Sequence, residues 1–394
     1  MSDATRPITV LITAAEASGD KLGAGLVRAL RRRLPDRVVR IVGIGGRELE
    51  AEGLTSPFDI SELSILGFTE GVKALPRVVR RADEVAALAQ DARPDAAVLI
   101  DSWGFSLRVA QRLKRLTPPV WVVKYVGPQI WASRPGRAKT LAATVDHLLS
   151  TQSMDAPFYA PLGLPVSFVG NPALALDVSG ADGVRARQQL GIKPDQPLLL
   201  VLPGSRPAEI ARLAAPFGEA AARLKLSHPD LAIVVPVAHT VAASVREAVR
   251  HWPVQPILIE DDSAKLDAMA ACTVALAASG TVTTELALCG APIVVGYRVG
   301  ALTYFFGKMI ITTRYFTLLN IAAGEEIAPE YIQGRCTGEA LAAALAQRLD
   351  SARLREDQIA AQNRALDLMG RHNSDPSENA AAAIIADLER LGRL

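Results

Sequence analysis

Cysteine is scarce in this sequence, and its few thiols lie far apart. The 394 residues include only Cys272, Cys289 and Cys336, which form no CxxC pair. An odd number of widely spaced thiols argues against a disulfide framework and against a thiolate zinc site. We therefore expect buried free thiols.

An excess of charge of one sign is also missing. The sequence has 43 Lys and Arg against 41 Asp and Glu, a net charge of +2, and the basic residues are scattered. This balance creates no field that attracts a polyanion, so nucleic acid is not an expected partner. With 49% apolar residues the chain can bury a sizeable core, and its length predicts two domains.

Long hydrophobic runs are absent as well. No window approaches the roughly 20 apolar residues that a membrane-spanning helix needs. The first apolar stretch, residues 8–15, is short and has no basic segment before it, unlike a secretory signal. We therefore expect a cytoplasmic protein.

Short Val- and Ile-rich runs alternate with amphipathic stretches. The predicted strands are residues 8–14, 38–43, 96–101, 120–125, 145–149, 198–202, 232–237, 257–259, 273–277 and 293–295, and the clearest predicted helices are 21–33, 72–90, 106–116 and 208–226. This alternation is typical of buried parallel sheets. We predict an α/β protein with two doubly wound, Rossmann-like domains, 1–172 and 173–350, and a helical tail, 351–394, that is free to pack back on the first domain. Ligands should bind at the carboxyl ends of the strands, in a cleft between the domains.

Polar residues follow two predicted strands of the N-terminal half. After residues 8–14, the sequence EASGDKLGAGL contains Gly19 in a tight turn, whose free N–H groups suit an anion or a sugar hydroxyl. Ser18 or Asp20 could equally cap the following helix. Asp101 ends the strand AAVLID, where a general base could reach an alcohol. A helix cap or a structural ion pair is the alternative for Asp101.

The loop KYVGPQIWASRPGR contains aromatic and basic side chains that a core does not require. Trp131 and Arg134 could contact a phosphate or an acceptor, although the segment could equally be a solvated basic helix start. Apolar residues beside basic ones recur at residues 301–316 and in a first stretch, Leu63, Ile65, Leu66, Phe68, Arg77 and Arg81. Such stretches suit an anionic lipid surface, and a core helix with a solvated face is the alternative.

The C-terminal half contains two turns of the phosphate-binding type. Gly204, Ser205 and Arg206 stand between a buried strand and a helix, where backbone N–H groups and a guanidinium suit a diphosphate. The Lys of a P-loop is missing, so nucleotide hydrolysis is disfavoured. The second turn, with a carboxylate one helical turn later, consists of Ser279, Gly280, Thr281 and Glu285. Ordinary capped turns remain the alternative.

Two further observations concern ligands of the C-terminal half. No acidic pair that could hold a metal lies near these turns, so a site without metal is expected. Asn320 and Gln333 lie in a loop-rich stretch beside an apolar run, where amides suit hydroxyl recognition. A surface loop is the alternative.

Taken in order, these segments resemble the motifs of the lipid-A-disaccharide synthase family. They span residues 14–333 and include EASGDKLGAGL, GIGGREL, VLID, KYVGPQIWASRPGR, FVGNP, LPGSRPAEI, ASGTVTTELAL, VVGYR and LNIAAGEEIAPEYIQ. The resemblance implies a GT-B fold with the nucleotide in the C-terminal domain. It also implies an inverting transfer of 2,3-diacylglucosamine from UDP to 2,3-diacylglucosamine 1-phosphate (lipid X). The products would be a β-1,6-linked lipid A disaccharide 1-phosphate and UDP, in lipopolysaccharide synthesis.

The resemblance also assigns expected roles to residues. It makes Asp101 the expected general base and places on the acceptor side Glu16, Ser18, Gly19, Trp131 and Arg134. The expected contacts of the UDP-sugar are Gly204, Ser205, Arg206, Ser279, Gly280, Thr281, Glu285, Asn320 and Gln333. The chain departs from the family at Gly104 and Ser106, where an acid and an Asn are common, at Asn171 (His) and at Leu319 (Pro). Peripheral contact with the anionic inner face of the cytoplasmic membrane is expected, and a homodimer is compatible with the resemblance.

Two alternative functions share part of this pattern. Another GT-B enzyme that uses UDP-N-acetylglucosamine, such as a peptidoglycan glucosaminyltransferase or a 2-epimerase, would have a similar nucleotide half. The N-terminal segments EASGD and YVGPQIW match the disaccharide synthases instead. A non-catalytic nucleotide-sugar-binding protein would not need Asp101.

Overall fold

The computed structural model describes residues 6–63, 68–237, 241–261, 264–300, 313–372 and 375–394, and at 68–74 it describes the backbone alone. The chain divides into two compact units, one of Met1–Pro172 with Asn373–Leu394 and one of Ala173–His372. Ile65, Leu66, the side chain of Phe68 and residues 301–312 lie outside the described residues.

The first unit is built on a parallel sheet. Its described strands run in the order β2-β1-β3-β4-β5-β6. Their bounds are β1 (Ile8–Ala14), β2 (Val39–Ile44), β3 (Ala96–Ile100), β4 (Val122–Tyr125), β5 (His147–Ser150) and β6 (Val166–Phe168). Every residue of β1 and β3 is buried, because helices cover both faces of the sheet and leave no polar side.

Helices cover two faces of this sheet and form two apolar clusters with it. The described helices of the first unit are α1 (Ala17–Arg33), α2 (Arg47–Ala51), α3 (Phe68–Ala92), α4 (Trp103–Leu113), α5 (Arg137–Ala142), α6 (Ala156–Tyr159) and the C-terminal α16 (Pro376–Arg390). The predicted helix 72–90 corresponds to α3, which continues through Pro76.

The second unit has a sheet with a different strand order. Its described strands are also parallel and run in the order β12-β11-β10-β7-β8-β9. Their bounds are β7 (Leu198–Leu202), β8 (Ala232–Pro236), β9 (Ile257–Ile259), β10 (Val274–Ala277), β11 (Ile293–Tyr297) and β12 (Glu330–Ile332). The described helices are α7 (Gly183–Gln189), α8 (Pro207–Ser227), α9 (Ala242–Arg250), α10 (Ala264–Ala271), α11 (Val282–Leu288), α13 (Leu318–Ala323), α14 (Gly338–Asp350) and α15 (Ala352–Leu368).

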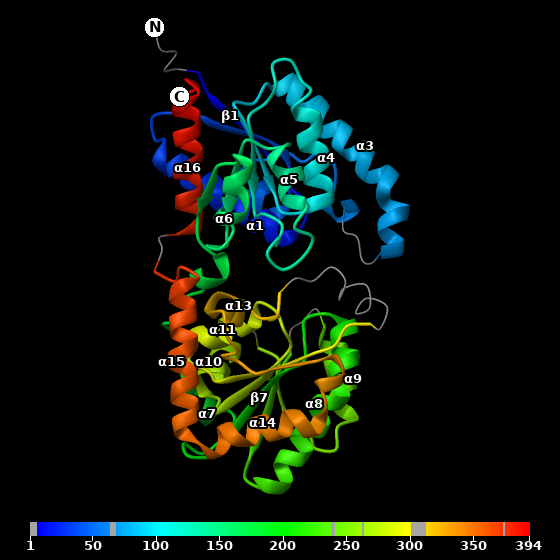
Figure 1. Ribbon diagram of the computed structural model, residues 1–394, viewed down its shortest axis with the longest axis vertical. Coiled ribbons are helices and arrows are strands. Elements are labelled where there is room, and N and C mark those ends of the chain that lie inside the picture. The colour runs from blue at the N-terminus through cyan, green and yellow to red at the C-terminus, as the bar shows by residue number, and fades with distance from the viewer. Residues whose placement is uncertain (1–5, 64–67, 238–240, 262–263, 301–312, 373–374) are drawn as a thin grey trace. The chain divides into compact units, whose positions relative to one another are not determined.

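The predicted fold class, an α/β protein with two parallel sheets, is confirmed (Figure 1). All ten predicted strands are present, several of them shifted by one or two residues. The short strands β6 and β12 were not predicted. None of the described helices is both long enough and apolar enough to cross a membrane.

Both sheets reverse their winding direction at one point, and ligands of such folds bind at the carboxyl ends of the strands there. In the first unit the reversal lies between β1 and β3; Glu16 comes two residues after β1, and Asp101 directly follows β3. In the second unit it lies between β7 and β10, which are followed by Pro203 and Ala278. The topology therefore points to the same four strand ends as the sequence motifs.

The last three helices are shared between the units (Figure 1). Helix α14 packs on α8, and α15 packs on α11 and α13, all within the second unit. Helix α16 instead packs on α1 in the first unit. There the Asp387 carboxylate accepts hydrogen bonds from the Trp121 indole at 3.2 Å and Arg390 at 3.1 Å, and its Oδ2 lies 2.6 Å from His147 Nδ1. A buried polar cluster thus fixes the C-terminal helix to β5.

Candidate active site

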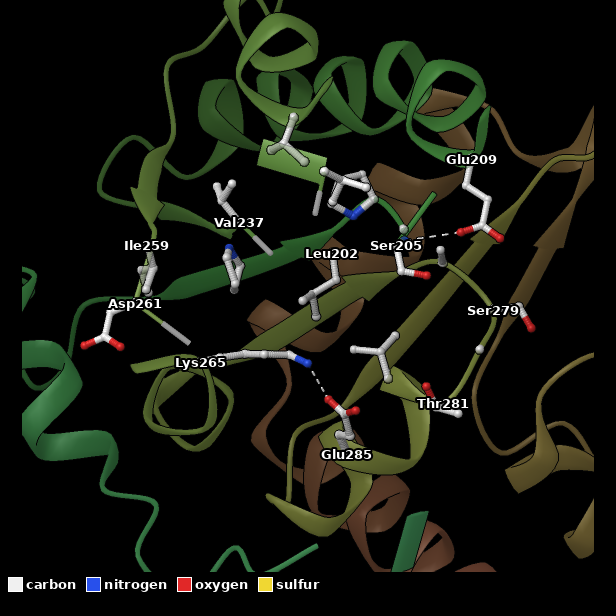
Figure 2. Close-up of a pocket in the computed structure, with 18 residues that line it drawn as sticks. Leu202, Ser205, Glu209, Val237, Ile259, Asp261, Lys265, Ser279, Thr281 and Glu285 are labelled. Carbon is white, nitrogen blue, oxygen red and sulfur yellow. Dashed lines mark hydrogen bonds and ion pairs between the residues drawn. The ribbon is translucent and has the colours of Figure 1, made fainter. Parts of the chain in front are cut away.

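A cavity of about 280 Å³ opens at the winding reversal of the second unit (Figure 2). Residues from the ends of β7, β8, β9 and β10 and from α8, α9, α10 and α11 line it. The predicted donor residues among them are Gly204, Ser205, Ser279, Gly280, Thr281 and Glu285. The structure therefore brings together six of the nine residues that were predicted to bind a UDP-sugar.

The first turn of this cavity has a backbone that only glycine adopts readily. Gly204 has a φ of +125°, and a Cβ there would lie 2.8 Å from Glu209 Cβ and 2.9 Å from Glu209 Oε2. The same Oε2 accepts a hydrogen bond of 3.2 Å from Ser205 N. Helix α8 begins at Pro207 without a side-chain cap. Pro207 has no N–H, and Glu209 N and Ile210 N donate to Arg206 O, so in the first turn the N–H of Ala208 is the one left without a partner among the described residues and available to an anion.

Arg206 lies beside this cavity and does not line it. Its side chain is 73% exposed, and its guanidinium pairs with Glu209 Oε1 at 3.1 Å. Glu209, which the sequence motifs did not single out, thus organises the turn through Ser205 N (Figure 2). It also restrains the Arg206 guanidinium. A guanidinium on an exposed stem can reorient onto a diphosphate, and the charge of the ligand would compete with Glu209 for it.

The second turn places an ion pair in the same cavity. Glu285, on α11, accepts a hydrogen bond of 2.6 Å from the ammonium of Lys265 on α10, and both side chains line the cavity. Ser279 Oγ donates to the carbonyl of Phe316 at 3.2 Å. Lys265 was not predicted, because nothing in the local sequence marks it and only the folding of α10 beside α11 brings it to Glu285.

Asn320 and Gln333 do not line the cavity. Asn320 is 0% exposed; its amide donates to Ala328 O at 2.7 Å and Glu330 Oε1 at 2.8 Å, and its oxygen accepts from the N–H groups of Ile327 and Ala328. Gln333 bonds both backbone polar groups of Val299. Both amides are therefore used inside the protein. Leu319, one of the departures from the family, is buried in the core.

In the first unit, backbone strain gathers at the carboxyl ends of β3 and β4. Among the described non-glycine residues, six have positive φ, and four of them are Asp101 (+44°), Ser102 (+43°), Val126 (+67°) and Arg134 (+51°). Such conformations cost about 1–3 kcal/mol each and cluster at functional sites. The partly exposed carboxylate of Asp101 makes no hydrogen bond with a described residue. It is therefore able to accept a proton from a ligand.

A second cavity of about 280 Å³ lies beside this turn, also within the first unit. It is lined by Glu16, Leu63, Leu75, Val78, Ser102, Gly104, Phe105 and Arg108. The predicted acceptor residue Glu16 and the predicted acyl contact Leu63 thus share one cavity, which begins at the residue after Asp101. Its mixed apolar and charged lining suits an amphiphile.

The other residues predicted on the acceptor side have different surroundings. Ser18 is exposed, and Gly19 is buried against Ile100. Asp20 does not cap its own helix; its carboxylate accepts hydrogen bonds from Gly46 N at 2.7 Å and Glu48 N at 2.9 Å. It therefore caps α2, which connects the EASGD segment to GIGGREL.

The loop after β4 holds the remaining predicted acceptor residues. Arg134 is exposed. Trp131 lies at Asp155, whose carboxyl pKa burial raises to about 6, against the opposing effect of hydrogen bonds from Ser150 and Trp131. Asn171, another departure from the family, is buried near the end of the first unit. Gly104 and Ser106 follow the Asp101 turn at the start of α4.

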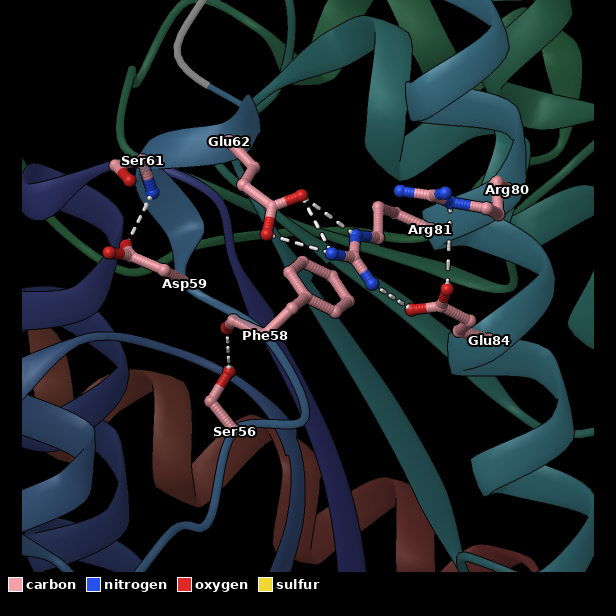
Figure 3. A network of polar contacts seen from close by, with 8 residues as sticks. All are labelled: Ser56, Phe58, Asp59, Ser61, Glu62, Arg80, Arg81 and Glu84. Atoms are coloured by element: carbon pink, nitrogen blue, oxygen red, sulfur yellow. Dashed lines mark hydrogen bonds and ion pairs between the residues drawn. The ribbon is translucent and has the colours of Figure 1, made fainter.

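The two arginines among the predicted lipid contacts differ in exposure. Arg77 is exposed on α3. Arg81 is 15% exposed; it pairs with Glu62 at 2.7 Å and Glu84 at 2.6 Å and lies over the Phe58 ring at 4.3 Å (Figure 3). The hydrogen bond with Glu62, followed by that with Glu84, raises the pKa of Arg81. Arg81 thus anchors α3 to the segment that carries Leu63.

Among the described residues, no group of three or more His, Cys, Asp or Glu is placed to hold a metal ion.

Comparison with known protein sequences identifies a family. The family model described as lipid-A-disaccharide synthetase matches residues 10–385. A lipid-A-disaccharide synthase of Rhodospirillum centenum is 38% identical over 380 residues, which are 96% of this chain and 94% of that protein. The enzyme of the same name from Paramagnetospirillum magneticum is 41% identical over 386 residues, 98% of each.

Solved structures show the fold. The S. aureus MnaA-UDP co-structure has a TM-score of 0.60 at 14% identity and covers 99% of this chain and 98% of its own. A UDP-GlcNAc 2-epimerase from Neisseria meningitidis bound to UDP-GlcNAc reaches 0.57 at 12% identity, covering 97% and 99%. MurG of Acinetobacter baumannii reaches 0.54 at 16% identity, covering 98% and 100%. The expected GT-B fold is confirmed.

Proposed function

Because this chain belongs to the lipid-A-disaccharide synthase family, we propose that it joins UDP-2,3-diacylglucosamine to 2,3-diacylglucosamine 1-phosphate (lipid X). The family establishes a glycosyltransferase of lipid A synthesis, and the identity of the two lipid substrates is our proposal. The products are the β-1,6-linked disaccharide 1-phosphate and UDP.

The observation that supports the donor half best is the cavity of the second unit. It combines the glycine turn before α8, the hydroxyls of Ser279 and Thr281, and the Lys265–Glu285 pair at one winding reversal. Backbone N–H groups at the start of a long helix suit diphosphate oxygens, and a carboxylate suits ribose hydroxyls. Two solved structures of the same fold, at the low identities given above, are described as bound to UDP or UDP-GlcNAc.

We propose that Asp101 is the general base of the reaction. Its carboxylate would accept the proton of the acceptor 6-hydroxyl while that oxygen forms a bond to the anomeric carbon of the donor. The bond from this carbon to the diphosphate breaks in the same displacement, so that an α-linked donor yields a β-linked product. The departing electron pair stays on UDP, where the start of α8 and Arg206 would stabilise it.

The role of Arg206 leads to a prediction on nucleotide affinity. Arg206→Ala should weaken UDP binding about tenfold, because a hydrogen bond to a charged group contributes about 1.5–3 kcal/mol and part of this is offset by loss of the Glu209 pair. Isothermal titration calorimetry with UDP measures the effect. Arg212→Ala, which removes the same charge from an exposed position on α8, is the matched control. Equal affinities of the two variants would remove Arg206 from the donor site.

We also propose that α3 contacts the anionic inner face of the cytoplasmic membrane. Leu75 is 42% exposed, and Arg77 and Arg80 are exposed on the same helix. Apolar and basic side chains together favour a surface that carries anionic headgroups. Vesicles with and without anionic lipid, sedimented with the protein, test this contact.

The reaction itself is tested with purified protein, UDP-2,3-diacylglucosamine and lipid X, with and without EDTA. Mass spectrometry should find the disaccharide 1-phosphate, and the yield should be the same with EDTA because no metal is expected to act. Product from UDP-N-acetylglucosamine and a lipid-linked peptidoglycan acceptor, or its 2-epimer, would instead favour another GT-B enzyme. Absence of any product would favour a non-catalytic binding protein.

A further inference from the structure

One buried cation of the first unit contacts the backbone of the proposed base. Lys124 is on β4, paired in register with Leu99 of β3, and is 2% exposed. The strand neighbours on β4 that share its burial are aliphatic or aromatic, as expected inside a parallel sheet. Burying an ammonium among such side chains costs free energy unless polar groups form hydrogen bonds with it.

The polar groups that compensate Lys124 converge on the turn that carries Asp101. Its ammonium donates to the carbonyl of Asp101, to Leu99 O at 3.2 Å and to Tyr125 O at 3.4 Å. Ser106 Oγ lies 3.5 Å from the ammonium and donates to the same Asp101 carbonyl at 2.6 Å. Two donors from different elements therefore hold one carbonyl oxygen of the strained turn.

We propose that Lys124 is a positioning residue of this enzyme, whose buried ammonium fixes the Asp101–Ser102 turn and thereby the direction of the Asp101 carboxylate. This inference rests on the proposed role of Asp101. Asp101 and Ser102 both have positive φ angles, although neither is a glycine, the residue that adopts such angles readily. Hydrogen bonds from the Lys124 ammonium to the Asp101 carbonyl restrain such a turn in one conformation.

The electrostatics agree with this geometry. Burial lowers the pKa of Lys124 to about 7, and the negative charge of Asp101 acts in the opposite direction. The ionised carboxylate is the form that accepts a proton.

The test compares Lys124→Met and the milder Lys124→Gln with the parent enzyme at saturating concentrations of both substrates. We expect kcat to fall about tenfold or more in Lys124→Met, with KM for both substrates unchanged within about twofold and UDP affinity unchanged. Lys124→Gln should lose less, because its amide still donates. Val98→Ala, which leaves a cavity in buried β3 away from the turn, is the control for lost stability and should keep its kcat.

A double-mutant cycle separates positioning from a general structural effect. Asp101→Asn with Lys124→Met should be no slower than Asp101→Asn alone, since Lys124 acts through Asp101. If both Lys124 variants keep kcat within about twofold of the parent while Asp101→Asn is inactive, this inference is overturned and the base assignment stands. If the fold-loss of kcat in the double variant equals the product of the fold-losses in the two single variants, the inference is overturned as well. An active Asp101→Asn would remove the base assignment itself. If Lys124→Met does not fold, Lys124→Gln carries the same comparison.

Discussion

Asp101→Asn should fold like the parent protein, and its turnover should fall by about 10²–10⁴-fold, the range typical of general-base catalysis. The amide has the shape of the carboxylate but cannot take the proton of the acceptor hydroxyl. Asn also tolerates the positive φ of this position, and the carboxylate makes no hydrogen bond with a described residue that the change would break. Single-turnover kinetics with the two proposed lipid substrates measures the loss.

The control for Asp101→Asn is Asp91→Asn, the same change on the exposed side of α3. It should leave turnover unchanged. Melting temperatures of both variants should agree with that of the parent, and calorimetry should give the same UDP affinity for all three, because the donor cavity lies in the other unit. Near-parental turnover of Asp101→Asn would exclude it as the base.

Much of the fold could be predicted because buried parallel strands are continuous apolar runs. β1 and β7 begin and end where the sequence predicts. β12 escaped prediction because its first residue, Glu330, is charged and yet 4% exposed. Its carboxylate is buried under hydrogen bonds from Phe316 N, Thr317 N and Asn320. Such compensation comes from residues 10 to 14 positions away and leaves no local pattern.

The sequence located cavity-lining residues where a motif follows a strand, and it did not locate side chains whose partners are distant in sequence. Gly204 and Ser279 stand at strand ends, which topology places together. Asp20 resembled a cap of its own helix, but its partner is α2, 26 residues away. Asn320 resembled a ligand contact, but its amide closes the turn before β12. A polar side chain near a motif has the same sequence signature in both roles.

Gly204→Ala should lower UDP affinity about ten- to hundredfold while the protein remains folded. The new Cβ would lie 2.8 Å from Glu209 Cβ, and the φ of +125° is one that alanine rarely adopts. Strain of about 1–3 kcal/mol is enough to turn the peptide away, and each 1.4 kcal/mol corresponds to a factor of ten in affinity. The N–H groups before α8 would then no longer face the diphosphate. Isothermal titration calorimetry with UDP measures the loss.

Gly180→Ala is the matched control for this prediction, because a Cβ at Gly180 meets no atom within 4 Å and its φ lies outside the positive range. It should bind UDP like the parent. Glu209→Gly in the Gly204→Ala background removes both close contacts, with Glu209 Cβ and Oε2, and leaves the unfavourable φ, so that partial recovery of affinity would assign the remaining loss to the backbone. Parental affinity of Gly204→Ala would mean that the diphosphate does not approach this turn, and the donor site would have to be placed elsewhere in the second unit.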